Sequence, residues 1–120
     1  LVVMTVSSIS AGLIVQSKKL LIFYNEEEEA WDVPSARPEK GEISADAAQR
    51  IAKNFSGADC SVTKYRKNLK TEVSGEAWNP YVVKIDGEPQ KGELVSKAEI
   101  KERELVPHIE EMKEKFAKKI

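Results

Sequence analysis

The part of this chain that most constrains its fold is residues 31–58, WDVPSARPEKGEISADAAQRIAKNFSGA. We expect an extended segment, a polar loop over residues 35–43, one amphipathic helix and a glycine at its end. Ser44 suits the N-cap position, and Asp46 suits the positive end of the helix dipole. Gly57 stands where a left-handed C-cap residue is expected. The apolar residues at helical spacing, which form one stripe, are Ala47, Ala48, Ile51, Ala52 and Phe55.

This loop–helix–loop resembles the signature of the Nudix hydrolase family, written G-x5-E-x7-R-E-U-x-E-E-x-G-U with U an aliphatic residue. One register fits the chain without gaps. The residues that agree with the box in this register are Glu42, Arg50, Ala52, Gly57 and Ala58. The residues that depart from it are Ala36, Ile51, Asn54 and Phe55. Trp31 and Pro34 also match the W-x-L-P segment that often precedes the box, so the resemblance rests mainly on scaffold positions.

The departures fall on the acidic positions of the box. In the family, these helix glutamates hold magnesium or manganese against a diphosphate and help to activate the attacking water. Hard divalent cations require oxygen ligands. Ile51 and Phe55 have no side-chain oxygen, and Asn54 offers only one neutral carbonyl. Lys53 adds a positive charge beside them. We therefore expect no metal ion and no other cofactor at the ordinary Nudix site.

The matching residues have structural roles in the family. The resemblance implies that Glu42 and Arg50 form an ion pair that braces the loop against the helix, and that Gly57 ends the helix. If the protein is an enzyme, Glu42 is the catalytic candidate, as a ligand to magnesium or manganese. Glu39 is the other weak candidate ligand in the loop. The catalytic base is unassigned.

Two further features could carry chemistry. Residues 25–29, NEEEE, hold four adjacent acids that could supply oxygen ligands. Adjacent acids repel one another and lack a spacing that converges on one ion, so we predict a solvated loop. The only histidine, His108, has no carboxylate or cysteine partner identifiable in the sequence. We expect it to be an exposed or packing residue rather than a general base.

The two tryptophans are candidate ligand-stacking residues. Aromatic side chains of Nudix proteins often stack on a nucleobase, and the π-face of Trp31 or Trp78 could do the same. The alternative for each ring is packing in the core or at the rim of a sheet. The sequence leaves both alternatives open.

Strand signals lie on both sides of the box. Residues 2–9 could form a short strand, and residues 10–16 and 20–24 are apolar, β-branched or aromatic. The polar residues 17–19 give the last two strands a tight connection, which predicts a hairpin. Residues 81–85, YVVKI, are the clearest late strand. The near-continuous apolar character of the hairpin predicts burial on both faces of a sheet.

Helix signals close the chain. Ser96 and Glu99 have the spacing of a capping box, which predicts a short helix. Pro107 suits the first turn of a final helix. The stripe of that helix comprises Ile109, Met112, Phe116 and Ile120. This order of elements agrees with the Nudix fold, so we predict one α/β domain over residues 1–120, with a mixed β-sheet sandwiched between α-helices.

The composition of the chain gives no sign of nucleic acid or a membrane as a binding partner. The formal net charge of -1 provides no field that favours nucleic acid or a membrane. No apolar run approaches the roughly 18 residues that span a bilayer. Cys60, the only cysteine, cannot form an internal disulfide, which fits the reducing cytoplasm. We expect a cytoplasmic protein.

Two functions follow from the degenerate box. The first is a non-catalytic Nudix-like module that binds a nucleotide, another small diphosphate ligand or a protein partner. The second is an active hydrolase that cleaves nucleoside diphosphate derivatives through a displaced magnesium or manganese site. Many Nudix proteins form pairs, so a homodimer is compatible with either function, but no segment marks a dimer face.

Overall fold

A computed structural model of the protein describes residues 8–119. The strands are β1 (Ser8–Gln16), β2 (Lys19–Asn25), β3 (Ala30–Asp32), β4 (Ser35–Ala36), β5 (Cys60–Tyr65), β6 (Thr71–Val73), β7 (Glu76–Ile85) and β8 (Glu93–Val95). The helices are α1 (Ser44–Ser56), α2 (Lys97–Glu102), α3 (Pro107–Glu110) and α4 (Lys113–Lys119), with a 3₁₀ turn, η1 (Lys67–Leu69).

The strands form a mixed sheet, as predicted, with the central order β3-β2-β1-β7-β5. β1 pairs with β2 in an antiparallel hairpin and with β7 in parallel. Ser17 and Lys18 have positive φ values of 52° and 63°, which closes the hairpin tightly. Of the strand predicted over residues 2–9, only Ser8 and Ile9 lie in the described part, and both belong to β1. The late strand is longer than residues 81–85, because β7 begins at Glu76.

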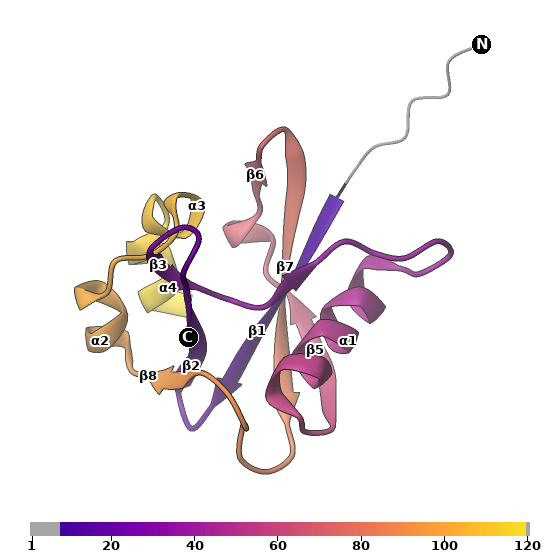
Figure 1. Cartoon of the computed structure of the whole chain (residues 1–120), viewed down its shortest axis with the longest axis horizontal. Helices are drawn as coiled ribbons and strands as arrows, with labels where there is room; N and C mark the ends of the chain where they lie inside the picture. Colours follow the sequence, from indigo (N-terminus) through magenta and orange to yellow (C-terminus); the bar gives the residue numbers. More distant parts are fainter. Residues whose placement is uncertain (1–7, 120) are drawn as a thin grey trace.

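Helices cover both faces of the sheet. Successive side chains of a strand point to opposite faces, so Leu13 and Ile14 of β1 enter two different cores. The core beneath α1 contains Ile14, Leu21, Ala52, Val83 and Ile85. The core on the other face includes Leu13, Leu20, Ile22, Trp78, Ile100, Ile109 and Phe116, contributed by the sheet and by α2, α3 and α4. Figure 1 shows α1 on one side of β1 and β7, and α2–α4 on the other.

The capping signals have different outcomes. The Ser96 side chain accepts from the Glu99 amide at 3.3 Å, and the Glu99 carboxylate accepts from the Ser96 amide at 3.1 Å, which confirms the capping box. The prediction of a single final helix is wrong, because a turn at residues 111–112 separates α3 from α4. Of the predicted stripe, Ile109 and Phe116 are buried. Ile120 lies outside the described residues.

The close approach of α1 to the sheet depends on Gly12 of β1. A Cβ atom at this position would lie 3.1 Å from the carbonyl oxygen of Ala48 and 3.2 Å from the Cβ of Ala52. These distances leave no room for a branched side chain, because backbone and an alanine form the opposing surface. Small residues on the two facing elements therefore set their separation.

Gly12→Val is accordingly expected to destabilise the protein by about 1–3 kcal/mol, because the valine methyl groups must push α1 away from β1. Equilibrium denaturation by urea, followed by circular dichroism, measures the change. Gly12→Ala is the graded control and should cost less. Equal stability of Gly12→Val and the wild type would contradict the tight packing of this interface.

Candidate functional site

The helix of the box begins one residue earlier than predicted. Ser44 is the first residue of α1, and the N-cap residue is Ile43, which makes no side-chain capping bond. The Ser44 hydroxyl instead lies 2.7 Å from the Ser10 hydroxyl of β1. The N-cap prediction is wrong because the extended backbone conformation of a cap falls on Ile43, with φ -77° and ψ 156°, which leaves Ser44 inside the helix. At the other end, Gly57 adopts the expected left-handed conformation, with φ 72°.

Glu42 and Arg50 form an ion pair that holds the box loop against α1. Arg50 Nε donates to Glu42 Oε2 at 3.0 Å, and Arg50 Nη2 donates to Oε1 at 3.0 Å. The same Nη2 donates to the carbonyl oxygen of Arg37 at 3.1 Å. Glu42 Oε1 also accepts from the backbone amide of Glu39 at 3.0 Å. Both carboxylate oxygens of Glu42 are thus engaged in holding the loop.

The hydrogen bonds from Arg50 hold the pKa of Glu42 below its usual value. A lowered carboxyl pKa means that the unfolded chain binds the proton more readily than the folded protein. The stabilisation from this pair is therefore complete above the ordinary glutamate pKa of 4.5 and is lost as the pH falls through the lowered value of the folded state.

We expect Glu42→Gln to increase the hydrogen exchange of the loop amides, residues 37–43, several-fold at neutral pH, because a neutral amide cannot hold Arg50 as strongly. The matched control is Glu39→Gln, since the Glu39 carboxylate is exposed and lies 3.8 Å from Arg50 Nη1. Below the pKa of Glu42, the variant and the wild type should converge. Unchanged exchange at neutral pH would show that this pair does not order the loop.

The residues that depart from the box pattern lie at packing and surface positions. The ring of Phe55 lies 5.0 Å from that of Phe23, centroid to centroid, and packs against the core beneath α1. Asn54 is exposed, and Ile51 is half-buried. Within residues 8–119, no three histidine, cysteine, aspartate or glutamate side chains are grouped so that they could hold a metal ion.

Both tryptophans make packing contacts, and neither lines the cavity described below. Trp78 is 1% exposed and packs against His108 and Phe116, so its ring has no free face for a ligand. Trp31 is half-buried, and the guanidinium of Arg103 lies 4.6 Å from the centroid of its ring. Tyr24 contacts Trp31 edge-on. Both rings therefore make packing contacts, which is the second of the two alternatives, ligand stacking or packing.

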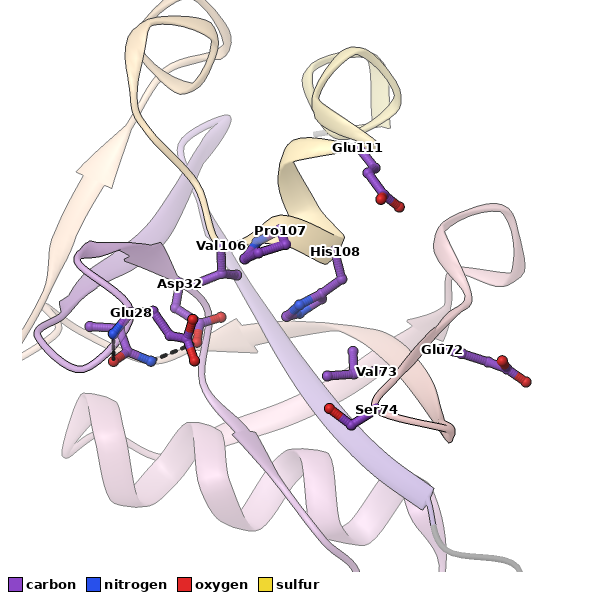
Figure 2. Close-up of a pocket in the computed structure, with 10 residues that line it drawn as sticks. Glu28, Asp32, Glu72, Val73, Ser74, Val106, Pro107, His108 and Glu111 are labelled. Atoms are coloured by element: carbon purple, nitrogen blue, oxygen red, sulfur yellow. Dashed lines mark hydrogen bonds between the residues drawn. The ribbon is translucent and has the colours of Figure 1, made fainter.

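A cavity of about 420 Å³ lies between the β2–β3 turn, the β6–β7 turn and α3 (Figure 2). This volume is within the range of small-molecule sites. Its lining residues are Asn25, Glu28, Asp32, Glu72, Val73, Ser74, Val106, Pro107, His108 and Glu111. Of the predicted solvated loop, residues 26–29 form an exposed turn, whereas Asn25 is half-buried at the end of β2. Asn25 and Glu28 line this cavity.

Asp32 and His108 are the least exposed ionisable residues of the cavity. Burial raises the pKa of Asp32 and lowers the pKa of His108, in both cases by disfavouring the charged form. Each group partly offsets this effect on the other. The imidazole is therefore neutral at pH 7. Asp32 reaches His108 only through the fold, so this partner was not identifiable from the neighbours of His108 in the sequence. Glu111, three residues further along the chain, also partly offsets the effect of burial on the pKa of His108.

Comparison with solved structures identifies the fold. A MutT structure, from work on the proteins of Aliivibrio salmonicida and Vibrio cholerae, superposes with a TM-score of 0.78 and 17% identity over 97% of this chain and 100% of that one. A NUDIX family hydrolase from Clostridium perfringens gives 0.73 and 15%, over 96% and 98%. A putative Nudix hydrolase family member from Chromobacterium violaceum gives 0.74 and 15%, over 98% and 80%.

These similarities show that the chain has the Nudix fold, as the box register predicted. No protein-family model and no curated protein matches the sequence. No helix within residues 8–119 is both long enough and apolar enough to cross a membrane.

Proposed function

We propose that this chain is a non-catalytic Nudix-fold module, and that its ligand occupies the cavity between the β2–β3 turn, the β6–β7 turn and α3. The ligand is a small molecule or a segment of a protein partner, and the resemblance to Nudix hydrolases brings nucleotides into the set to be tested. The module requires no metal cofactor. A cytoplasmic location, suggested by the single cysteine, is part of the same proposal.

The packing of Phe55 is the observation that best supports the non-catalytic role. A glutamate at this box position would project a carboxylate toward a metal ion, as the resemblance implies. Phe55 instead contacts Phe23 and the core beneath α1, which supports the helix but supplies no ligand. Glu42, the one glutamate that agrees with the box pattern, is engaged by Arg50 and by the Glu39 amide.

The alternative is an active hydrolase with a displaced metal site built from Glu39 and Glu42. Its two carboxylates both lie within 4 Å of Arg50, whose positive charge opposes the binding of a divalent cation. The residues of the acidic run that could complete such a site do not group with them into a metal cluster in the described part of the chain. The geometry therefore favours the module.

A hydrolysis assay separates the two functions. The purified chain is incubated with nucleoside triphosphates, nucleoside diphosphate sugars and dinucleoside polyphosphates, with magnesium or manganese, and phosphate-containing products are quantified. We expect no product above the protein-free control. Metal-dependent hydrolysis that disappears in Glu42→Gln would instead establish the displaced site. Glu88→Gln is the matched charge control, because Glu88 is exposed and belongs neither to the box loop nor to the acidic run.

A further inference from the structure

The charge of the cavity limits what can enter it. Four of its lining residues carry carboxylates, namely Glu28, Asp32, Glu72 and Glu111, and none of the ten is lysine or arginine. The remaining ionisable residue, His108, is neutral at pH 7 because burial lowers its pKa. A wall of like charge without a cation repels phosphate and attracts positive groups. The cavity thus differs sharply from a phosphate-binding site.

Asp32 supplies an oriented carboxylate in this cavity. Its Oδ1 accepts from the Val33 amide at 2.8 Å, and its Oδ2 accepts from Asn25 Nδ2 at 3.3 Å. Each carboxylate oxygen can accept a second hydrogen bond. Glu28 lies beside Asp32 on the same wall in Figure 2, and its negative charge also raises the pKa of Asp32. A cation between these carboxylates would relieve their repulsion.

His108 adds an independent sign of an unfilled hydrogen-bonding position. Its Nε2 atom is buried and has no hydrogen-bond partner within the described residues 8–119. Figure 2 shows the imidazole projecting into the space that Asp32 and Glu28 face. A buried polar atom without a partner costs free energy unless a ligand or water satisfies it. A neutral imidazole can accept a hydrogen bond at this nitrogen.

We propose that the cavity binds a guanidinium group, with Asp32 as its anionic partner and His108 Nε2 as a further hydrogen-bond acceptor. This inference rests on the proposed ligand-binding function and names the chemistry of the ligand. A guanidinium carries planar, paired N–H donors that match a carboxylate, together with the positive charge that this cavity attracts. The group belongs either to a small guanidinium compound or to an arginine side chain of a protein partner.

Titration of the whole chain with N-acetyl-arginine amide tests the proposal. The ring signals of His108, the only histidine, and the side-chain amide of Asn25 report binding by NMR. N-acetyl-citrulline amide is the matched probe, because its urea group keeps the planar shape and N–H donors but has no charge. We expect saturable shifts with the arginine compound and at least roughly tenfold weaker binding of the citrulline compound. Equal binding of the two would overturn the proposal.

Two variants locate the site. Asp32→Asn retains an oxygen for the Val33 amide and removes the charge, and it should weaken binding about tenfold or more. Glu26→Gln makes the same change of charge in the β2–β3 turn, at a residue that does not line the cavity. It should leave the affinity within twofold. Unaltered affinity in Asp32→Asn would contradict the role of Asp32.

Further titrations distinguish a small guanidinium compound from a protein arginine, and test whether a metal ion or a nucleotide binds instead. Ethylguanidinium that binds as well as N-acetyl-Gly-Arg-Gly amide indicates a small-molecule ligand, whereas much tighter binding of the peptide indicates a partner's arginine. Shifts of His108 and Asn25 that saturate with magnesium chloride alone, or with GDP or ADP, would overturn the proposal. Hydrolysis of the nucleotide substrates would remove the non-catalytic role, while guanidinium binding to the cavity would still stand on its own readout.

Discussion

Trp78→Ala is expected to destabilise the protein by about 3–5 kcal/mol. Trp78 is the largest of the fully buried side chains. Its ring lies 5.0 Å from that of His108 and 6.2 Å from that of Phe116, so it joins β7 to α3 and α4. Its Nε1 also donates to Ser35 Oγ at 3.4 Å. Truncation would leave a large cavity at the place where the sheet meets these two helices.

Urea denaturation followed by circular dichroism measures this loss, unless the variant is already unfolded. Small domains are stable by about 5–15 kcal/mol, so a substantial unfolded fraction in buffer also agrees with the expectation. Trp78→Phe, which keeps a ring in the core, should lose less. Tyr24→Ala is the exposed control, since 48% of Tyr24 is accessible to solvent. A loss below about 1 kcal/mol in Trp78→Ala would show that the ring is not a packing centre.

Phe55→Glu is the second prediction with a large effect, and it places a glutamate at a position where the Nudix box pattern has one. We expect a loss of about 2–4 kcal/mol, since the contact with Phe23 disappears and a carboxylate enters a largely apolar environment. Asn54→Glu restores the neighbouring acid at an exposed position and should change stability by no more than about 0.5 kcal/mol. Denaturation curves of the two variants supply the comparison.

Equal stability of Phe55→Glu and Asn54→Glu would contradict the packing role of Phe55. The predicted difference has a simple origin. Consecutive helix residues point in directions about 100° apart, so one of the two side chains packs over the sheet while the other faces solvent.

Local patterns predicted much of the fold, because the residues that decide them are close in sequence. The Ser96–Glu99 capping box and the hairpin turn at residues 17–18 depend on neighbours within a few positions. The prediction for the N-cap of α1 was wrong by one residue, because the extended cap conformation falls on Ile43. The Ser44 hydroxyl contacts the distant Ser10, which no local pattern indicates. The start of β7 at Glu76 was also missed, since residues 76–80 include a proline and lack strand alternation.

The cavity could not be predicted, because its walls come from segments far apart in the chain. Asp32 and His108 act on each other's pKa across 76 positions of sequence, from 32 to 108. Two features of the sequence single out His108: it is the only histidine, and it follows the proline that begins α3. The box, in contrast, is a contiguous segment, so its register alone was enough to place Glu42, Arg50 and Gly57.

Paramagnetic manganese tests the central claim most directly, namely that this Nudix fold has lost the negative charge that would hold its metal ion. Backbone amide signals of residues 42–57 are followed by NMR during titration with manganese chloride, with and without a nucleoside diphosphate sugar. We predict no saturable broadening confined to the start of α1 and its loop. Site-specific broadening there that saturates, deepens with the nucleotide and is lost in Glu42→Gln would contradict the account.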